Sequence, residues 1–127
     1  MSEEQRLQRG VERFTELFGR PPSRDGKLDD FTRIAMSNLF GDVWTREGLS
    51  LRERSMITLT ALIVLGRADE LRLHLRGALN IGISRQTIEE MMIHLAHYGG
   101  YPVGRSGLQI AREVFDKADA AKARGKT

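Results

Sequence analysis

The chain has 127 residues, of which 40% are hydrophobic and 29% charged, and its formal net charge at pH 7 is +3. This length and composition predict one globular domain that spans residues 1–127. Because the sequence has no cysteine, it excludes disulfides, thiolate catalysis, iron–sulfur clusters and cysteine-ligated zinc.

The charge and hydropathy patterns argue against binding to nucleic acid or to a membrane. Acidic residues are interspersed among the basic ones, and the sequence has no uninterrupted basic face with aromatic platforms. The longest apolar run covers residues 61–65, whereas a membrane span needs about 20 apolar residues. The N-terminus is polar and lacks the apolar run of a secretory signal. We therefore expect a cytoplasmic protein.

Apolar residues recur at helical spacing along the chain, and no alternating strand pattern of useful length is present. The sequence thus predicts an all-α fold of about six helices. They are expected over residues 4–18, 28–44, 51–65, 70–80, 85–98 and 103–120, followed by a polar tail over residues 119–127. Ser50 and Glu53 form a capping box at the start of the third helix.

The third expected helix is apolar on almost all sides, which predicts that it is among the most buried. Leu73 lies off the main apolar stripe of the helix that follows. Together these features give more apolar surface than one small monomer can bury. We therefore expect a homo-oligomer.

The pattern that points most directly to chemistry surrounds His74. Glu70 lies four residues before it on the same expected helix, where a carboxylate can orient the imidazole and favour its protonated form. Arg72 and Arg76 flank the histidine, and arginine suits a two-pronged grip on a carboxylate. Spacing alone slightly favours the alternative, a buried histidine on an apolar stripe with arginines in solvent.

A second group of ring side chains lies in the fifth expected helix. His94 and Tyr98 are four residues apart, and His97 lies between them on another face. His94 could provide a further acid or hydrogen-bond donor. Two histidines three residues apart are a weak zinc signal without a third ligand at a recognisable offset, so we expect a surface or interface pair and no metal.

Three segments resemble the carboxymuconolactone decarboxylase family in order and spacing. They are FGDVWTREGLSLRERSM over residues 40–56, GRADELRLHLRGALNIG over residues 66–82, and IEEMMIHLAHYGGYP over residues 88–102. The resemblance runs from about residue 28 to 115. It implies an all-helical fold that forms trimers or hexamers and decarboxylates a lactone of aromatic catabolism, in the protocatechuate branch, without a cofactor.

The same superfamily has a branch of thiol peroxidases that resemble alkylhydroperoxidase and carry Cys-x-x-Cys before a histidine. In this sequence Arg67 and Glu70 occupy the two cysteine positions and His74 the histidine position. Peroxidase chemistry is therefore excluded. Two departures from the decarboxylase pattern, Ile81 in place of Asn and the segment of residues 103–105, leave the particular lactone open.

The reaction that the resemblance implies leads to a hypothesis for the roles of individual residues. His74 is expected to be the general acid/base, oriented by Glu70, while Arg76 holds a substrate carboxylate. The remaining substrate-binding candidates are Arg46, His94 and Tyr98, and the alternative for Arg46 is an interface salt bridge. Two other functions stay open: a related lyase, hydratase or isomerase on another small acid, and an oligomeric module without catalysis.

Overall fold

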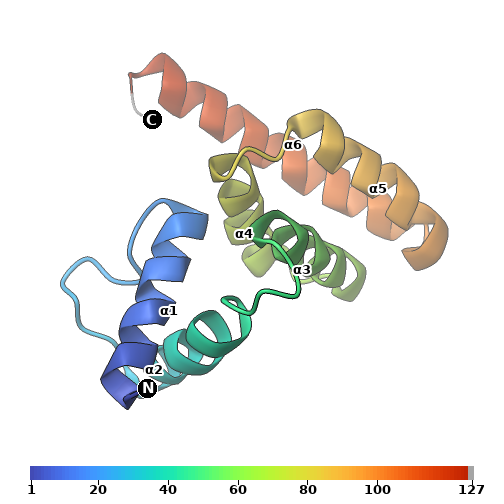
Figure 1. Cartoon of the computed structure of the whole chain (residues 1–127). Coiled ribbons are helices and arrows are strands. Elements are labelled where there is room, and N and C mark those ends of the chain that lie inside the picture. The colour runs from blue at the N-terminus through green and yellow to red at the C-terminus, as the bar shows by residue number, and fades with distance from the viewer. Residues whose placement is uncertain (126–127) are drawn as a thin grey trace. The chain divides into compact units, whose positions relative to one another are not determined.

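The computed structural model describes residues 1–125 and confirms the all-α fold class, because those residues contain helices and no strand (Figure 1). The elements are α1 (Glu3–Phe18), α2 (Asp30–Ile34), the π-helix η1 (Ala35–Val43), α3 (Leu51–Leu65), α4 (Ala68–Asn80), α5 (Arg85–Gly99) and α6 (Tyr101–Ala123). The chain divides into two compact units, Met1–Arg54 and Ser55–Thr127. That the two form one domain stays a prediction, and each unit is described by itself.

In the first unit, α1 packs against η1 with the two backbones in contact. A capping box between Ser2 and Gln5 begins α1. A Cβ atom added at Gly10 would lie 1.8 Å from the carbonyl oxygen of Met36, and one added at Gly41 would lie 2.5 Å from that of Arg6. Only residues without a side chain permit this approach.

The π-helix is the main departure from the predicted elements. The sequence predicts one continuous helix over residues 28–44, whereas the structure has the short α2 followed by nine π-helical residues. The Trp44 amide donates to the Leu39 carbonyl at 2.8 Å, five residues back. Because π-helices are rare, apolar residues at helical spacing predict an ordinary α-helix in this segment.

Ionic contacts add to the packing of α1 on η1. The Arg6 guanidinium donates to the Asp42 carboxylate, with Nη2 to Oδ2 at 2.7 Å. Arg9 donates to the other Asp42 oxygen at 3.3 Å. The hydrogen bonds from Arg6 hold the pKa of Asp42 below its usual value, so this carboxylate is ionised at neutral pH.

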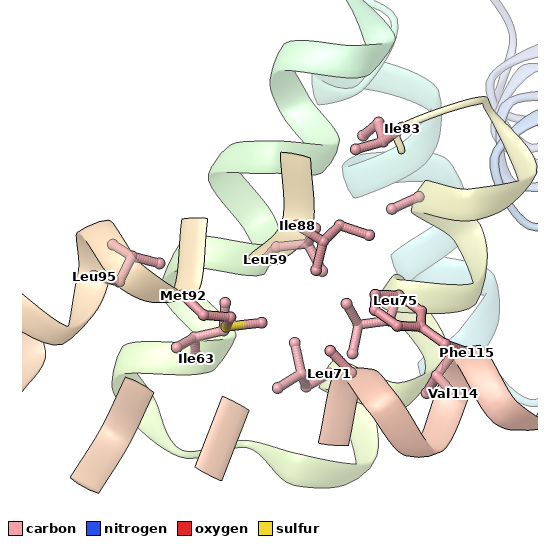
Figure 2. Packing of buried hydrophobic residues seen from close by; sticks show 12 residues of the cluster. Leu59, Ile63, Leu71, Leu75, Ile83, Ile88, Met92, Leu95, Val114 and Phe115 are labelled. Carbon is pink, nitrogen blue, oxygen red and sulfur yellow. The ribbon is translucent and has the colours of Figure 1, made fainter. Parts of the chain in front are cut away.

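The second unit contains the larger hydrophobic core, to which α3, α4, α5 and α6 all contribute side chains (Figure 2). Its buried members are Leu59, Ile63, Leu71, Leu75, Ala78, Ile83, Ile88, Met92, Leu95, Ala111, Val114 and Phe115. Residues that the sequence places far apart, such as Leu59 and Phe115, therefore belong to one cluster. This cluster fixes the rotation of each helix that contributes to it.

The prediction that α3 is among the most buried helices is wrong, because only one face of the helix is buried. Ser55, Leu59 and Ile63 are buried, at intervals of four residues. On other sides of the helix Ile57 is 54% exposed and Leu65 is 71% exposed. The apolar surround predicted from the sequence is present, but a single chain does not cover it.

The helices α5 and α6 pack closely in the second unit. A Cβ atom added at Gly104 would lie 2.7 Å from the Ala96 Cβ, and one added at Gly107 would lie 2.8 Å from the Met92 sulfur. The helix α6 continues to Ala123, so the predicted polar tail of residues 119–127 begins inside a helix, and its residues 126–127 lie outside the described residues. Within residues 1–125, no helix is both long and apolar enough to cross a membrane.

We expect Gly10→Ala to destabilise the protein by about 1–3 kcal/mol, the usual cost of forcing extra volume into a packed contact. The added methyl group would overlap the Met36 carbonyl oxygen, which belongs to the backbone and cannot rotate away. Gly48→Ala is the matched control, because nothing lies within 4 Å of a Cβ at that position. Urea unfolding measures both, and equal midpoints for the two variants would contradict the close contact.

Candidate functional site

The candidate site begins at the turn between α3 and α4. Gly66 has a φ of 71°, a left-handed conformation that glycine adopts without strain, and it reverses the chain after α3. Arg67 follows as the N-cap of α4, and its amide donates to the Leu62 carbonyl at 2.9 Å. The guanidinium is therefore carried at the beginning of the helix that holds His74.

Three chemically active side chains adjoin one another at the beginning of α4. Glu70 and His74 are four residues apart on the helix, and Arg67, the non-helical N-cap, is placed next to Glu70 by a hydrogen bond. The Arg67 Nη2 atom donates to the Glu70 Oε1 atom at 2.8 Å. We refer to Arg67, Glu70 and His74 as the α4 row.

Electrostatics fix the charge states of the first two members of the α4 row. The hydrogen bond that Arg67 donates to the Glu70 carboxylate lowers the pKa of Glu70 and raises the pKa of Arg67. Both residues are therefore charged at neutral pH. Their side chains are 61% and 46% exposed, so water screens the attraction and the pair contributes little to stability.

His74 differs from the sequence-based expectation in its charge. The ring is half-buried on α4, and burial lowers its pKa to about 4, while the Glu70 carboxylate acts in the opposite direction with a smaller effect. Desolvation disfavours the charged imidazolium, and here it outweighs the attraction of the carboxylate. At neutral pH His74 is therefore a neutral imidazole, and not the protonated ring that spacing alone suggests.

The two arginines that flank His74 have different surroundings. Arg72 donates to Glu113 of α6 at 2.6 Å and to Asp69 at 3.1 Å, so it links α4 to α6. Arg76 is exposed. Because successive residues of an α-helix are rotated by about 100°, a residue two positions away points to a different side of α4 from His74. The structure does not bring Arg76 beside the imidazole.

The other predicted site residues lie elsewhere. The rings of His94 and Tyr98 are 5.1 Å apart, and Tyr98 is largely exposed. His94 lines a cavity of about 460 Å³ between α3 and α5, together with Met56, Ile57, Thr60, Thr87, Glu90, Met91 and Leu95. Arg46 is an exposed residue of the first unit, and its carbonyl accepts a hydrogen bond from Arg54 at 3.0 Å.

Two further features concern possible ligands. The His97 Nδ1 atom lies 2.8 Å from the Ile93 carbonyl oxygen, to which it can only donate, so in the neutral ring Nε2 accepts from the Tyr101 hydroxyl at 3.1 Å. His97 therefore bonds to the backbone of its own helix, α5, and to Tyr101 at the beginning of α6. Among residues 1–125, no group of three or more histidine and acidic side chains is arranged to hold a metal ion.

The sequence-based assignment gave Arg67 no role, although the structure brings its guanidinium to Glu70, one helical turn before His74. The available signal in the sequence is the spacing of three residues between Arg67 and Glu70. Arg72 and Arg76 are nearer in sequence, and proximity in sequence was misleading because residues two apart on a helix do not face each other.

Comparisons with known proteins agree with the motifs in the sequence. A family model described as the carboxymuconolactone decarboxylase family matches residues 29–113. The chain is 36% identical over 121 residues to 4-carboxymuconolactone decarboxylase of Acinetobacter baylyi, which covers 91% of this chain and 90% of that protein. It is 43% identical over 63 residues to nitrosuccinic acid decarboxylase npaB of Metarhizium robertsii, which covers 50% of this chain and 44% of that protein. The chain therefore belongs to the carboxymuconolactone decarboxylase family.

Proposed function

We propose that this protein is a carboxy-lyase that decarboxylates 4-carboxymuconolactone or a related small carboxylated acid without a cofactor. The observation that carries the proposal is the likeness to a 4-carboxymuconolactone decarboxylase along nine-tenths of both chains. The likeness to a nitrosuccinic acid decarboxylase supports the reaction class, loss of carbon dioxide, for a different acid. The experiment is a carbon dioxide release assay on purified protein with both acids as substrates.

The reaction itself needs an electron acceptor in the substrate. When the carboxylate leaves as carbon dioxide, the electron pair of the broken carbon–carbon bond moves into the conjugated lactone carbonyl and gives a dienolate. A proton must then be returned to carbon. The protein's task is to hold the acid, desolvate the leaving carboxylate, stabilise the new negative charge on oxygen and deliver one proton.

In our proposal, the face of α4 with Glu70 and His74 performs these steps. A neutral imidazole can donate its N–H hydrogen bond to the developing dienolate oxygen, and it carries no charge that would pair with the leaving carboxylate. His74 then passes a proton from solvent to carbon, while Glu70 stabilises the imidazolium that forms in that step. The other candidates, Arg76, Arg46, His94 and Tyr98, stay predictions.

The proposal includes a cytoplasmic trimer or hexamer. Large apolar side chains remain exposed on α3 and α5, among them Ile57, Leu65 and Ile93, each more than half exposed. Apolar surface of this extent is typical of a protein–protein interface. Most soluble oligomers are symmetric assemblies of one chain, so we expect further copies of this chain to cover this surface.

Sedimentation velocity measures the assembly. We expect a species three or six times the chain mass of 14.3 kDa at micromolar concentration. Ile57→Lys should reduce its mass, because a charge would be placed in the interface. Arg52→Glu, an exposed charge change on the same helix, is the control. A stable wild-type monomer would contradict the predicted oligomer.

Replacing the imidazole tests its catalytic role. His74→Gln should lower kcat by about 10²–10⁴-fold, the usual range for a lost general acid or base. Glu70→Gln should cause a smaller loss of kcat, because this residue acts through His74. The thermal midpoint is measured on the same preparations. Near-normal kcat with a lowered midpoint in His74→Gln would assign His74 a purely structural role.

The pKa of His74 predicts how stability depends on pH. In the unfolded chain the imidazole takes up a proton near pH 6.5, whereas in the folded protein it does so only near pH 4. The unfolded state therefore binds more protons between these values, and the contribution of His74 to stability, present above about pH 6.5, is lost as the pH falls towards 4.

Urea unfolding at pH 7 and pH 4.5 measures this effect. The free energy of unfolding of the wild type should fall more over this interval than that of His74→Gln. His97→Gln, which removes an exposed imidazole, should follow the wild type. The same pH dependence in the wild type and His74→Gln would show that the ring is not desolvated.

A further inference from the structure

We propose that Arg67 binds the carboxylate that the substrate retains after decarboxylation, and that Glu70 positions the guanidinium until the substrate displaces it. This inference rests on the proposed function and specifies its substrate class. The site would take dicarboxylic acids in which one carboxylate is bound by Arg67 and the other leaves. Nothing in the motif pattern assigns this role to Arg67.

The hydrogen bond to Glu70 places the Arg67 guanidinium on the side of α4 that carries His74. Glu70 lies one helical turn before His74, so one ligand along this side of the helix can contact both ends of the α4 row. Two helical turns span about 11 Å, and the arginine side chain can reach back over part of that length. The Arg67 side chain is 61% exposed, which leaves it accessible to a ligand from solvent.

The ion pair with Glu70 is one that a ligand can replace. The contact joins one guanidinium nitrogen to one carboxylate oxygen at 2.8 Å, between two partly exposed side chains. Pairs of this kind contribute only about 0–1 kcal/mol. A substrate carboxylate can form two parallel hydrogen bonds with the same guanidinium, a stronger arrangement. Binding would thus exchange a weak contact for a better one.

The other arginines near His74 are less suitable. Arg72 already donates to Glu113 and Asp69, and the contact with Glu113 holds α4 against α6. Arg76 points to a different side of the helix. Within α4 and its N-cap, Arg67 is therefore the cation placed to serve a ligand that also contacts His74.

The chemistry of decarboxylation decides which carboxylate Arg67 binds. Carbon dioxide is neutral, so a guanidinium paired with the leaving carboxylate would stabilise the starting state more than the transition state and slow the reaction. Pairing with the retained carboxylate stabilises both states equally and lowers KM. Carboxymuconolactone carries two carboxyl groups, and nitrosuccinic acid is a substituted butanedioic acid, so the acids named for both relatives fit this class.

Succinate is a suitable probe, because it has two carboxylates but no electron acceptor and cannot lose carbon dioxide here. We expect calorimetry to show saturable binding to the wild type. Arg67→Gln should weaken that binding at least tenfold, and Glu70→Gln should strengthen it, because the competing carboxylate is removed. A purely structural ion pair predicts loss of binding, or no change, in both variants.

Two matched variants control for general charge effects. Arg72→Gln removes another ion-paired arginine of α4, and Asp69→Asn removes a neighbouring acid, and both should bind succinate within twofold of the wild type. Thermal unfolding confirms that each variant is folded. With a substrate that the enzyme decarboxylates, Arg67→Lys should raise KM and leave kcat nearly unchanged. The lysine ammonium is a point charge and cannot form the two parallel hydrogen bonds of the planar guanidinium.

The outcomes separate this inference from the proposed function. If no carboxylated lactone is turned over but succinate binds with opposite effects of Arg67→Gln and Glu70→Gln, the decarboxylase proposal fails and the carboxylate site stands. If decarboxylation proceeds and Arg67→Gln leaves KM within twofold, the role of Arg67 is overturned. Absence of saturable succinate binding to the wild type also overturns it.

Discussion

The candidate site depends on how the hydrophobic core fixes the rotation of α4. Leu71, Leu75 and Ala78 are almost completely buried, and their intervals of four and three residues define one stripe of the helix. Once this stripe faces the core, the direction of every other side chain on α4 follows from about 100° of rotation per residue. His74 lies three residues after Leu71, at the edge of the stripe, and is therefore half-buried.

The chemistry of His74 follows from this half-buried position. A ring on the exposed side of α4 would keep an ordinary pKa, whereas a ring at the edge of the core loses part of its hydration and is neutral at physiological pH. The Glu70 carboxylate, one turn earlier, is more exposed and is held in its ionised form by Arg67. Helix rotation thus produces an environment in which a neutral imidazole and a charged ion pair are neighbours.

Much of the fold was predictable from the sequence, because apolar spacing and caps are local signals. The capping box at Ser50 and Glu53 is present, with both of its hydrogen bonds, and α3 has the predicted bounds. The π-helix was not predictable, because apolar spacing indicates a helix without showing which backbone hydrogen bonds it forms, and π-helices are rare. The sequence predicted more burial of α3 than the structure shows, because the composition of a helix does not indicate which of its faces pack against the rest of the same chain.

The site was predictable only in part, because its residues differ in how far they depend on packing. Helical spacing alone places Glu70 beside His74, and this holds for any α-helix. The charge of His74 depends on the core, which the spacing does not describe. The sequence-based assignment gave the carboxylate-binding role to Arg76, two residues from His74, although residues two apart on a helix do not face each other, and it gave Arg67 no role.

The α4 row also shows how one helical scaffold can serve different chemistry. The resemblance places Arg67 and Glu70 where the peroxidase branch carries its two cysteines, the second of them four residues before the shared histidine. Two thiols at this spacing can exchange electrons through a disulfide, whereas a guanidinium and a carboxylate can only exchange ionic partners. Decarboxylation moves an electron pair within the substrate and needs no redox group from the protein. Side chains that, as proposed, bind and release a carboxylate would therefore suit a lyase, and the buried stripe of α4 need not change.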